Sequence, residues 1–276
     1  MAGKSESLGF AERIVSWADV GRLWGELDMA NPFRTSNPVL SEKAFRDVVA
    51  TGEAMTLQGT VNKTGFLLLC AVVTAAWTWG MAHSEAPEAA MPWIWGGLIG
   101  GFVVALITTF KAQWSAITAP IYALLEGLAL GGISAYFEHV YPGIAAQAVG
   151  LTFGTLLVML LAYKTGMIRA TQGLKMGVIA ATGGIALLYV VEMVLGGFFH
   201  IAVPAINGSG VIGIGFSLFV VIIAALNLVL DFDMIESAVR AGAPKYMEWY
   251  GAFGMMVTLV WLYLEMLRLL SKMRRR

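Results

Sequence analysis

The amino-acid sequence predicts an all-α membrane protein with seven transmembrane helices, and three observations lead to this prediction. Hydrophobic residues make up 58% of the 276 positions, charged residues only 13%, and the mean hydropathy is +0.74. A water-soluble domain of this composition would expose enough apolar surface to aggregate. Seven apolar windows are long enough to cross about 30 Å of hydrocarbon. No segment shows the alternating polarity, over about ten residues, of a membrane β-barrel strand.

The apolar windows follow one another along the chain: Gly65–Met81, Pro92–Phe110, Ile117–Tyr136, Gly143–Tyr163, Met176–Phe199, Val211–Leu230 and Trp249–Leu270. At about 1.5 Å per residue, each reaches across the hydrocarbon as a helix. Pro120 falls in the first turn of the third window, where its missing N–H costs nothing. Trp93 and Trp249 open the second and seventh windows, as interfacial anchors do. Glu236 and Arg240 stand four residues apart and can extend the sixth helix past its window.

The chain divides into three parts: an N-terminal segment of residues 1–62, a seven-helix domain of residues 63–272 and a basic tail of residues 273–276. The N-terminal segment is rich in charges of both signs. Between Phe10 and Leu27, apolar residues recur at steps of three and four, which indicates a helix lying on the membrane surface. A flexible tail is the alternative.

Lysine and arginine are unevenly distributed between the two ends of the predicted helices. The loops after the second, fourth and sixth windows hold Lys111, then Lys164, Arg169 and Lys175, then Arg240 and Lys245, whereas the loops after the first, third and fifth windows hold none. The N-terminus is therefore predicted to be cytoplasmic. The basic C-terminal tail does not fit this rule, because a chain with a cytoplasmic N-terminus and seven spans has its C-terminus outside the cell. Either the first six helices set the orientation in spite of the basic tail, or one window is a re-entrant segment that does not cross the membrane. We keep the prediction of seven spans.

Five acidic residues lie within the apolar windows or close the sixth one: Glu126, Glu192, Asp231, Asp233 and Glu265, the last with Arg268 three residues on. A carboxylate inside a membrane costs a few kcal/mol unless it is protonated, paired or in contact with water. Hard cations such as calcium prefer oxygen ligands, and crowded carboxylates can hold protons near neutral pH. This set of acids with few basic partners predicts a route for cations or protons.

Asp231 and Asp233 cannot both face one pore, because they point about 200° apart on a helix. Asp233 shares a face with Glu236 and Arg240, so we interpret it as an ordinary charge at the helix end. Asp231 lies deeper and is the stronger functional candidate, and it is also the tentative ligand for a metal ion. Glu265 and Arg268, taken alone, are typical of a local ion pair.

Two stretches in the third and fourth windows, YALLEGLALGGISAYFE and AVGLTFGTLL, resemble the signature of the transmembrane Bax inhibitor motif family. The matching positions are Gly127, Leu130, Gly131, Ala148 and Thr152, while Gly132 stands where the family often has proline and the bulky Phe153 follows the threonine. NPFRTSNPVLSEKAF, LDFDMIE and VTLVWLYLEMLRLL resemble a bacterial branch of the family. The resemblance extends from Asn31 to Lys272.

The resemblance implies six helices around a central seventh, and a pH-dependent calcium leak through the membrane. In the family an acid on the sixth helix pairs with an acid on the seventh, and the state of the pair is coupled to pore opening. The first acid corresponds to Asp231, with Ile235 four positions on. The second resembles Glu265, with Arg275 ten positions on. A basic residue at the end of the second helix corresponds to Lys111.

The depth of the residues in the membrane favours a partner for Asp231 other than Glu265. If the sixth helix ends near Arg240 and the seventh begins near Lys245, the residues level with Asp231 are Gly254–Thr258. Glu265 then lies roughly 10 to 16 Å further along. The candidates for the pathway and its gate are therefore Asp231, Glu265, Thr258, Lys111, Asp233 and Glu126. A lysine partner and a carboxylate partner of Asp231 predict opposite responses to pH.

The function predicted from this resemblance is a pH-sensitive calcium or cation leak channel in the bacterial inner membrane. The alternative is a non-conducting regulator that binds a membrane protease or a stress-response partner. An enzyme is not expected: the sequence GIGFS at Gly213–Ser217 lacks the second glycine of an intramembrane serine protease. A retinal protein is not expected either, since Lys272 lies past the end of the seventh window.

No cofactor and no nucleic acid are expected. The expected partners are the lipid bilayer, calcium ions and protons. Cys70 is the single cysteine, so an internal disulfide is excluded. Gly127, Gly131 and Gly132 are interpreted as positions where helices approach closely in lipid.

Overall fold

The structure is a computed structural model, and it describes residues 53–84, 87–199, 206 and 208–275. All of these belong to the second of the chain's two units, residues 33–276, and only that unit is considered. The predicted surface helix between Phe10 and Leu27 lies outside the described residues.

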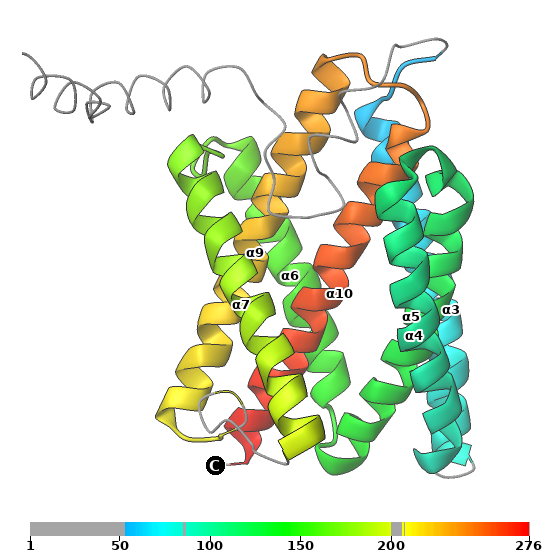
Figure 1. Ribbon diagram of the computed structural model, residues 1–276, viewed down its shortest axis with the longest axis vertical. Helices are drawn as coiled ribbons and strands as arrows, with labels where there is room; N and C mark the ends of the chain where they lie inside the picture. Colours follow the sequence, from blue (N-terminus) through cyan, green and yellow to red (C-terminus); the bar gives the residue numbers. More distant parts are fainter. Residues whose placement is uncertain (1–52, 85–86, 200–205, 207, 276) are drawn as a thin grey trace, which may run out of the picture. The chain divides into compact units, whose positions relative to one another are not determined.

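Seven long helices form the described part of the chain (Figure 1). They are α3 (Leu57–Ser84), α4 (Met91–Phe110), α5 (Ser115–Val140), α6 (Ile144–Lys164), α7 (Gln172–Phe199), α9 (Val211–Arg240) and α10 (Met247–Arg274). Two short 3-10 turns, η3 (Pro87–Ala90) and η4 (Ala112–Trp114), precede α4 and α5. Each long helix is apolar and long enough to cross a membrane. The predicted all-α membrane fold with seven spans is confirmed, and no strand forms within the described residues.

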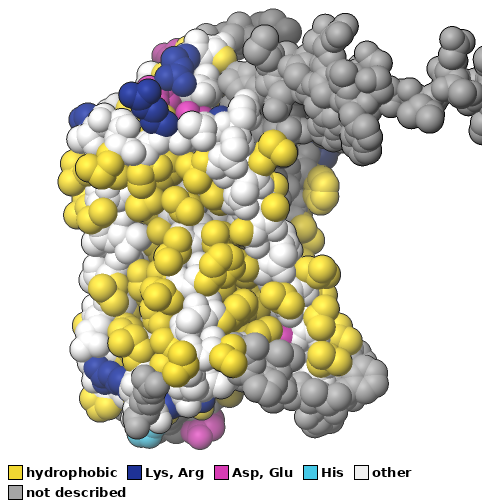
Figure 2. Space-filling view, turned by 90° about the vertical axis from the view of Figure 1, so that its left-hand side faces the viewer, with side chains coloured by type: hydrophobic (Ala, Val, Ile, Leu, Met, Phe, Trp, Pro, Cys, Tyr) yellow, Lys and Arg dark blue, Asp and Glu magenta, His cyan; other side chains and the backbone are white. Residues whose placement is uncertain are grey.

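Most helices extend beyond their apolar windows, because the polar residues at their ends continue the same backbone hydrogen bonding outside the hydrocarbon. The sixth predicted helix reaches Arg240, as its Glu236–Arg240 pair indicated, and that ion pair measures 2.9 Å. In Figure 2, which shows one face of the molecule, charged side chains gather at the two ends and the band between them is mostly apolar. This distribution fits a lipid-embedded middle.

Successive helices run in opposite directions, so the bundle has two ends (Figure 1). We call them the α9–α10 end, which carries the connection 241–246, and the α5–α6 end, which carries the connection 141–143. At the first, Ser115 donates a hydrogen bond to the carbonyl of Tyr246 (3.1 Å). At the second, Arg274 donates to the carbonyl of Pro142 (2.7 Å) and Arg275 to the Tyr141 hydroxyl (3.0 Å).

The turn after α9 determines which residues of α10 lie beside it. Gly242 adopts a left-handed conformation (φ 69°). Its N–H bonds the carbonyl of Val239, and the Ala243 N–H bonds the carbonyl of Ala238, both at 3.1 Å. These two bonds form a Schellman motif, which ends the helix and reverses the chain. As a result α10 starts at Met247 and returns along α9.

Glycines let α5 approach its neighbours closely. A Cβ at Gly127 would lie 2.3 Å from the carbonyl oxygen of Ala71, and one at Gly131 would lie 2.2 Å from that of Ala75, both on α3. At Gly132 the nearest atom is a side-chain carbon of Ile94 on α4, at 2.4 Å. Close backbone contact of this kind is how helices associate in lipid, where burial against a neighbour brings no hydrophobic gain.

α10 has the largest buried share of the seven membrane-spanning candidates, and α9 has the next largest. Side chains of α10 form hydrogen bonds with α5 through Tyr263 and Ser134 (2.6 Å), with α7 through Glu265 and with α9 through Thr258. The arrangement of six helices around a central seventh nevertheless stays a prediction. The deep position of α10 makes its polar residues the natural place to look for a functional site.

Candidate functional site

Asp231 lies in the buried interior between α9 and α10. Its exposed fraction is 0%, and Thr258 is 3% exposed. The Thr258 hydroxyl donates a hydrogen bond of 2.6 Å to Oδ2 of Asp231. The Schellman turn returns α10 along α9, which brings these two residues, 27 positions apart in sequence, to the same depth. An acid in an apolar interior needs such partners, because an uncompensated carboxylate there is costly.

Of the three predicted partners of Asp231, Thr258 is the one within hydrogen-bonding distance. Lys111 forms the C-cap of α4, is exposed, and has no ion pair with a described residue. Glu265 lies seven residues beyond Thr258, which is about 10 Å along α10. The depth estimate from the sequence therefore identified the position, whereas matching Glu265 to the second acid of the family did not bring it to Asp231.

Glu265 instead belongs to a polar group toward the α5–α6 end. It is 2% exposed, and its Oε1 accepts hydrogen bonds from the Tyr189 hydroxyl (2.8 Å) and from Arg268 (2.9 Å). The Arg268 guanidinium also lies over the Tyr189 ring, 4.7 Å from its centroid. Oε2 of Glu265 is buried with no hydrogen-bond partner among the described residues. The predicted Glu265–Arg268 ion pair is present, and it is joined to α7.

Asp233 and Glu236 are partly exposed on the other side of α9. Asp233 pairs with Lys175 of α7 at 2.7 Å, and Glu236 pairs with Arg240 at 2.9 Å. The Tyr163 hydroxyl of α6 donates to Glu236 at 2.5 Å. The interpretation of these two acids as paired charges at a helix end agrees with this geometry, although the partner of Asp233 is Lys175 rather than Arg240.

Glu126 is half-buried on α5 and interacts with Tyr122 one turn earlier. Its carboxylate lies against α4 where that helix has Gly101, since a Cβ there would come within 3.3 Å of Oε1. Glu126 therefore faces the α4–α5 contact. It is not joined to Asp231 by any contact that we observe.

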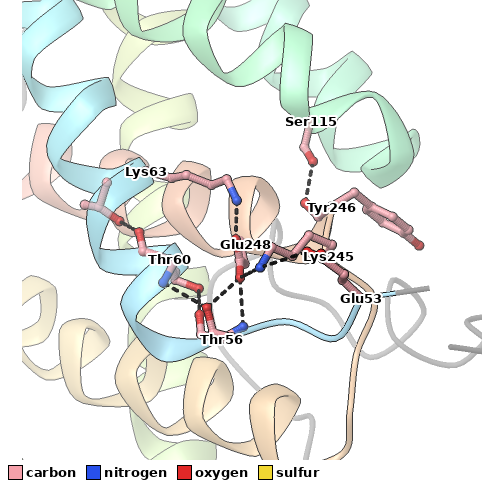
Figure 3. A network of polar contacts seen from close by, with 10 residues as sticks. Glu53, Thr56, Thr60, Lys63, Ser115, Lys245, Tyr246 and Glu248 are labelled. Atoms are coloured by element: carbon pink, nitrogen blue, oxygen red, sulfur yellow. Dashed lines mark hydrogen bonds and ion pairs between the residues drawn. The ribbon is translucent and has the colours of Figure 1, made fainter. Parts of the chain in front are cut away.

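The sequence did not single out Glu248, although it is almost completely buried (1% exposed). As Figure 3 shows, Glu248 lies at the α9–α10 end where α3 and α10 begin. Its carboxylate accepts hydrogen bonds from the N–H (2.8 Å) and hydroxyl (2.7 Å) of Thr56, and forms ion pairs with Lys63 and Lys245. An acid in the first turn of a helix is also favoured by the helix dipole. This cluster fastens α3 to α10 and is a structural feature of the bundle.

Two further buried polar residues were missed, Asn227 and Lys272. Asn227 lies one turn before Asp231 and donates to the Thr182 hydroxyl of α7 at 2.9 Å. Lys272 is 4% exposed and donates to the Ser217 hydroxyl (2.7 Å) and to the carbonyl of Gly213 (3.0 Å). A lone asparagine in an otherwise apolar window was the signal available for Asn227. For Lys272 the sequence held no signal of burial, because a lysine at a helix end is usually exposed.

The site has few ligands for a tightly bound metal ion. Within the described ranges, no three His, Cys, Asp or Glu side chains come together in a way that could hold one. A cavity of about 150 Å³ lies between α3, α5, α6 and α10, and apolar side chains such as Leu68, Val149 and Met256 dominate its lining. Ser134 and Tyr263 contribute hydroxyls to that lining, and these bond each other.

Comparison with known proteins places these features in a family. The model of the family described as Bax inhibitor 1 like matches residues 37–275. Searches among curated proteins and among solved structures found no match. The match covers all seven long helices, including the residues that suggested this resemblance in the third, fourth, sixth and seventh windows. The chain therefore belongs to the Bax inhibitor 1-like family of membrane proteins.

Proposed function

We propose that this protein is a pH-sensitive leak channel for calcium or related cations, in which Asp231 controls the pathway. The observation that carries the proposal is the fully buried Asp231 carboxylate, which accepts a hydrogen bond from Thr258 on the neighbouring helix. Membership of the Bax inhibitor 1-like family supports the same function. An acid at this depth is expensive to keep in a purely structural role, and acids inside membranes commonly mark ion or proton pathways.

In this proposal the hydrogen bond from Thr258 to Asp231 holds α9 and α10 together in one of the two states of the channel. With Asp231 ionised, its oxygens accept from Thr258 and also form a favourable contact for a passing cation. Protonation removes the negative charge and changes the hydrogen bonding across the helix contact. The two states of Asp231 therefore differ in how firmly α9 and α10 are held and in how well a cation is received.

We further propose that the α9–α10 end faces the cytoplasm of a bacterial cell, with the N-terminus on that side. Lys63, Lys111, Lys175, Arg240 and Lys245 lie toward this end, in agreement with the positive-inside rule. Arg274 and Arg275 lie toward the other end, bonded to the α5–α6 connection. Asp231 then lies in the cytoplasmic half of the bundle.

The experiment is calcium entry into proteoliposomes loaded with a calcium dye, measured at mildly acidic and mildly alkaline pH. We expect the wild type to admit calcium at a rate that changes between the two pH values. Asp231→Asn keeps the shape of the side chain and removes its titration, so its rate should become independent of pH. Asp233→Asn is the matched control, because it alters a partly exposed acid on the same helix, paired with Lys175.

Two results would contradict the proposal. The first is calcium entry no faster than in protein-free vesicles at either pH. The second is a wild-type pH response that persists unchanged in Asp231→Asn. A regulator of a membrane protease predicts the first result, together with loss of cellular activity when Met1–Ala30 is deleted.

A further inference from the structure

Polar side chains that are buried or half-buried join three helices of this apolar bundle. We call this set the polar seam: Lys175, Thr182 and Tyr189 of α7; Ser217, Asn227, Asp231 and Asp233 of α9; and Thr258, Glu265 and Lys272 of α10. On α7 and on α10 the members recur every seven residues. Seven residues are about two helical turns, so the members on each helix share one face.

Contacts between different helices join the members of the polar seam at successive depths. From the α9–α10 end they are Lys175 with Asp233 (2.7 Å), Thr258 with Asp231 (2.6 Å), Asn227 with Thr182 (2.9 Å), Tyr189 with Glu265 (2.8 Å) and Lys272 with Ser217 (2.7 Å). Adjacent levels are roughly 3 to 10 Å apart at about 1.5 Å per residue. The seam therefore extends from the proposed gate at Asp231 toward the opposite end of the bundle.

Glu265 is the member of the seam with a buried carboxylate oxygen that has no hydrogen bond among the described residues. Its Oε1 is occupied by Tyr189 and Arg268, while Oε2 is buried and has no hydrogen-bond partner among the described residues. The other charged groups around this level are Glu192 of α7, Lys272 of α10 and Arg275 directly after α10. From α9 the neighbouring polar side chain is Ser217, which does not titrate. An unbonded carboxylate oxygen in a dry interior is stabilised when a proton or a water molecule reaches it.

The chemistry of the seam suits protons better than calcium. Lys175 at one end and Arg268 with Lys272 at the other carry positive charges that repel a divalent ion. Hydroxyl, amide and carboxyl groups lie between them, and these can both donate and accept hydrogen bonds. Such groups provide the polar partners that bridging water molecules need.

We infer that protons reach Asp231 from the α5–α6 end through the polar seam, with Glu265 as the relay acid. A hydronium ion gives its proton to Oε2 of Glu265, where an O–H bond forms and water is released. That O–H bond then breaks, and the proton passes through water and hydroxyl groups to the Asp231 carboxylate. No electron is transferred. The inference rests on the proposed function, and it adds that the channel senses the pH on the side facing away from the Asp231 end.

The test uses proteoliposomes of phosphatidylethanolamine and phosphatidylglycerol in which all molecules have one known orientation, so that the pH can be stepped on one side at a time. Calcium entry and the infrared C=O band of protonated Asp231, assigned with Asp231→Asn, are followed together. An acid step on the α5–α6 side should change both signals in the wild type. Glu265→Gln, which cannot relay a proton, should slow the change of the Asp231 band by about tenfold or more. Thr182→Val should slow it as well.

Glu192→Gln is the matched control, because it removes a carboxyl group at the same level of α7 that is not part of the seam. It should respond as the wild type does. A wild-type response only to pH steps on the α9–α10 side would overturn the inference and leave the proposed channel intact. If the Asp231 band of Glu265→Gln changes as fast as that of the wild type, the inference is also overturned and the proposed channel is left intact. If no calcium enters under any condition the proposed function fails, and the infrared band still decides whether the seam delivers protons.

Discussion

Asp231 and Thr258 illustrate how a single polar contact can matter in a membrane interior. Both residues are buried, and the hydroxyl donates to the carboxylate at 2.6 Å. In water such a bond contributes little net stability, because each group bonds water equally well when the protein unfolds. In a buried apolar setting, removing the donor leaves the acceptor short of a partner, and the desolvation cost of that group then appears in full.

Replacing Thr258 with valine keeps the volume of the side chain and removes the donor to Asp231. We expect Thr258→Val to lower the unfolding free energy by about 1–3 kcal/mol, because the buried Asp231 carboxyl loses its hydrogen-bond donor. Thermal unfolding of the protein in detergent micelles measures this change. Thr109→Val is the control, because the Thr109 hydroxyl bonds the carbonyl of Ala105 within its own helix (2.8 Å) and has no bond to another described helix. Equal stability of the two variants would contradict a specific role for the Thr258 hydroxyl.

At the scale of helices, close packing of α5 against α3 is achieved without large side chains at the contact. Gly127 and Gly131 bring the α5 backbone against Ala71 and Ala75, and the Thr74 hydroxyl of α3 donates to the carbonyl of Leu124 at 2.9 Å. The α7–α9–α10 contact is of the opposite kind, since polar side chains join the helices. We infer that the first contact provides a rigid wall and that the second contains the groups able to change protonation.

Adding one methyl group at Gly131 should destabilise the bundle. Its Cβ would lie 2.2 Å from the carbonyl oxygen of Ala75 and 2.7 Å from its Cα, so α3 and α5 must move apart. We expect Gly131→Ala to cost about 1–3 kcal/mol, as overpacking of a tight core does. Gly150→Ala on α6 is the control, because a Cβ there meets nothing within 4 Å. Parallel melting curves of both variants test this, and a Gly131→Ala midpoint equal to that of Gly150→Ala would refute the close contact.

For the whole molecule, the alternating directions of the seven long helices put the start of α3 and the end of α10 at opposite ends of the bundle. In the proposed orientation Arg274 and Arg275 lie outside, which is contrary to the positive-inside rule. Both side chains are bonded to the α5–α6 connection, through Pro142 and Tyr141. The positive charge of both side chains is therefore engaged in local hydrogen bonds.

Cysteine labelling in intact cells tests this topology. In a Cys70→Ala background, the exposed Met273→Cys should react with a membrane-impermeant maleimide added outside. Lys245→Cys in the α9–α10 connection should react only after the membrane is permeabilised, because that end is predicted to be cytoplasmic. Labelling of both positions from the same side would mean that one helix does not cross the membrane.

The sequence by itself determined the fold class and the existence of the seven helices, because an apolar run of about 20 residues has hardly another stable structure in lipid. It also identified Asp231, since an acid beside Leu230 in so apolar a run is conspicuous in one dimension. The tertiary structure decided among the three candidate partners of Asp231 in favour of Thr258, and it alone supplied Lys175 for Asp233 and Tyr189 for Glu265. Helix rotation and depth depend on packing contacts between distant segments, and a local sequence pattern records these only in part.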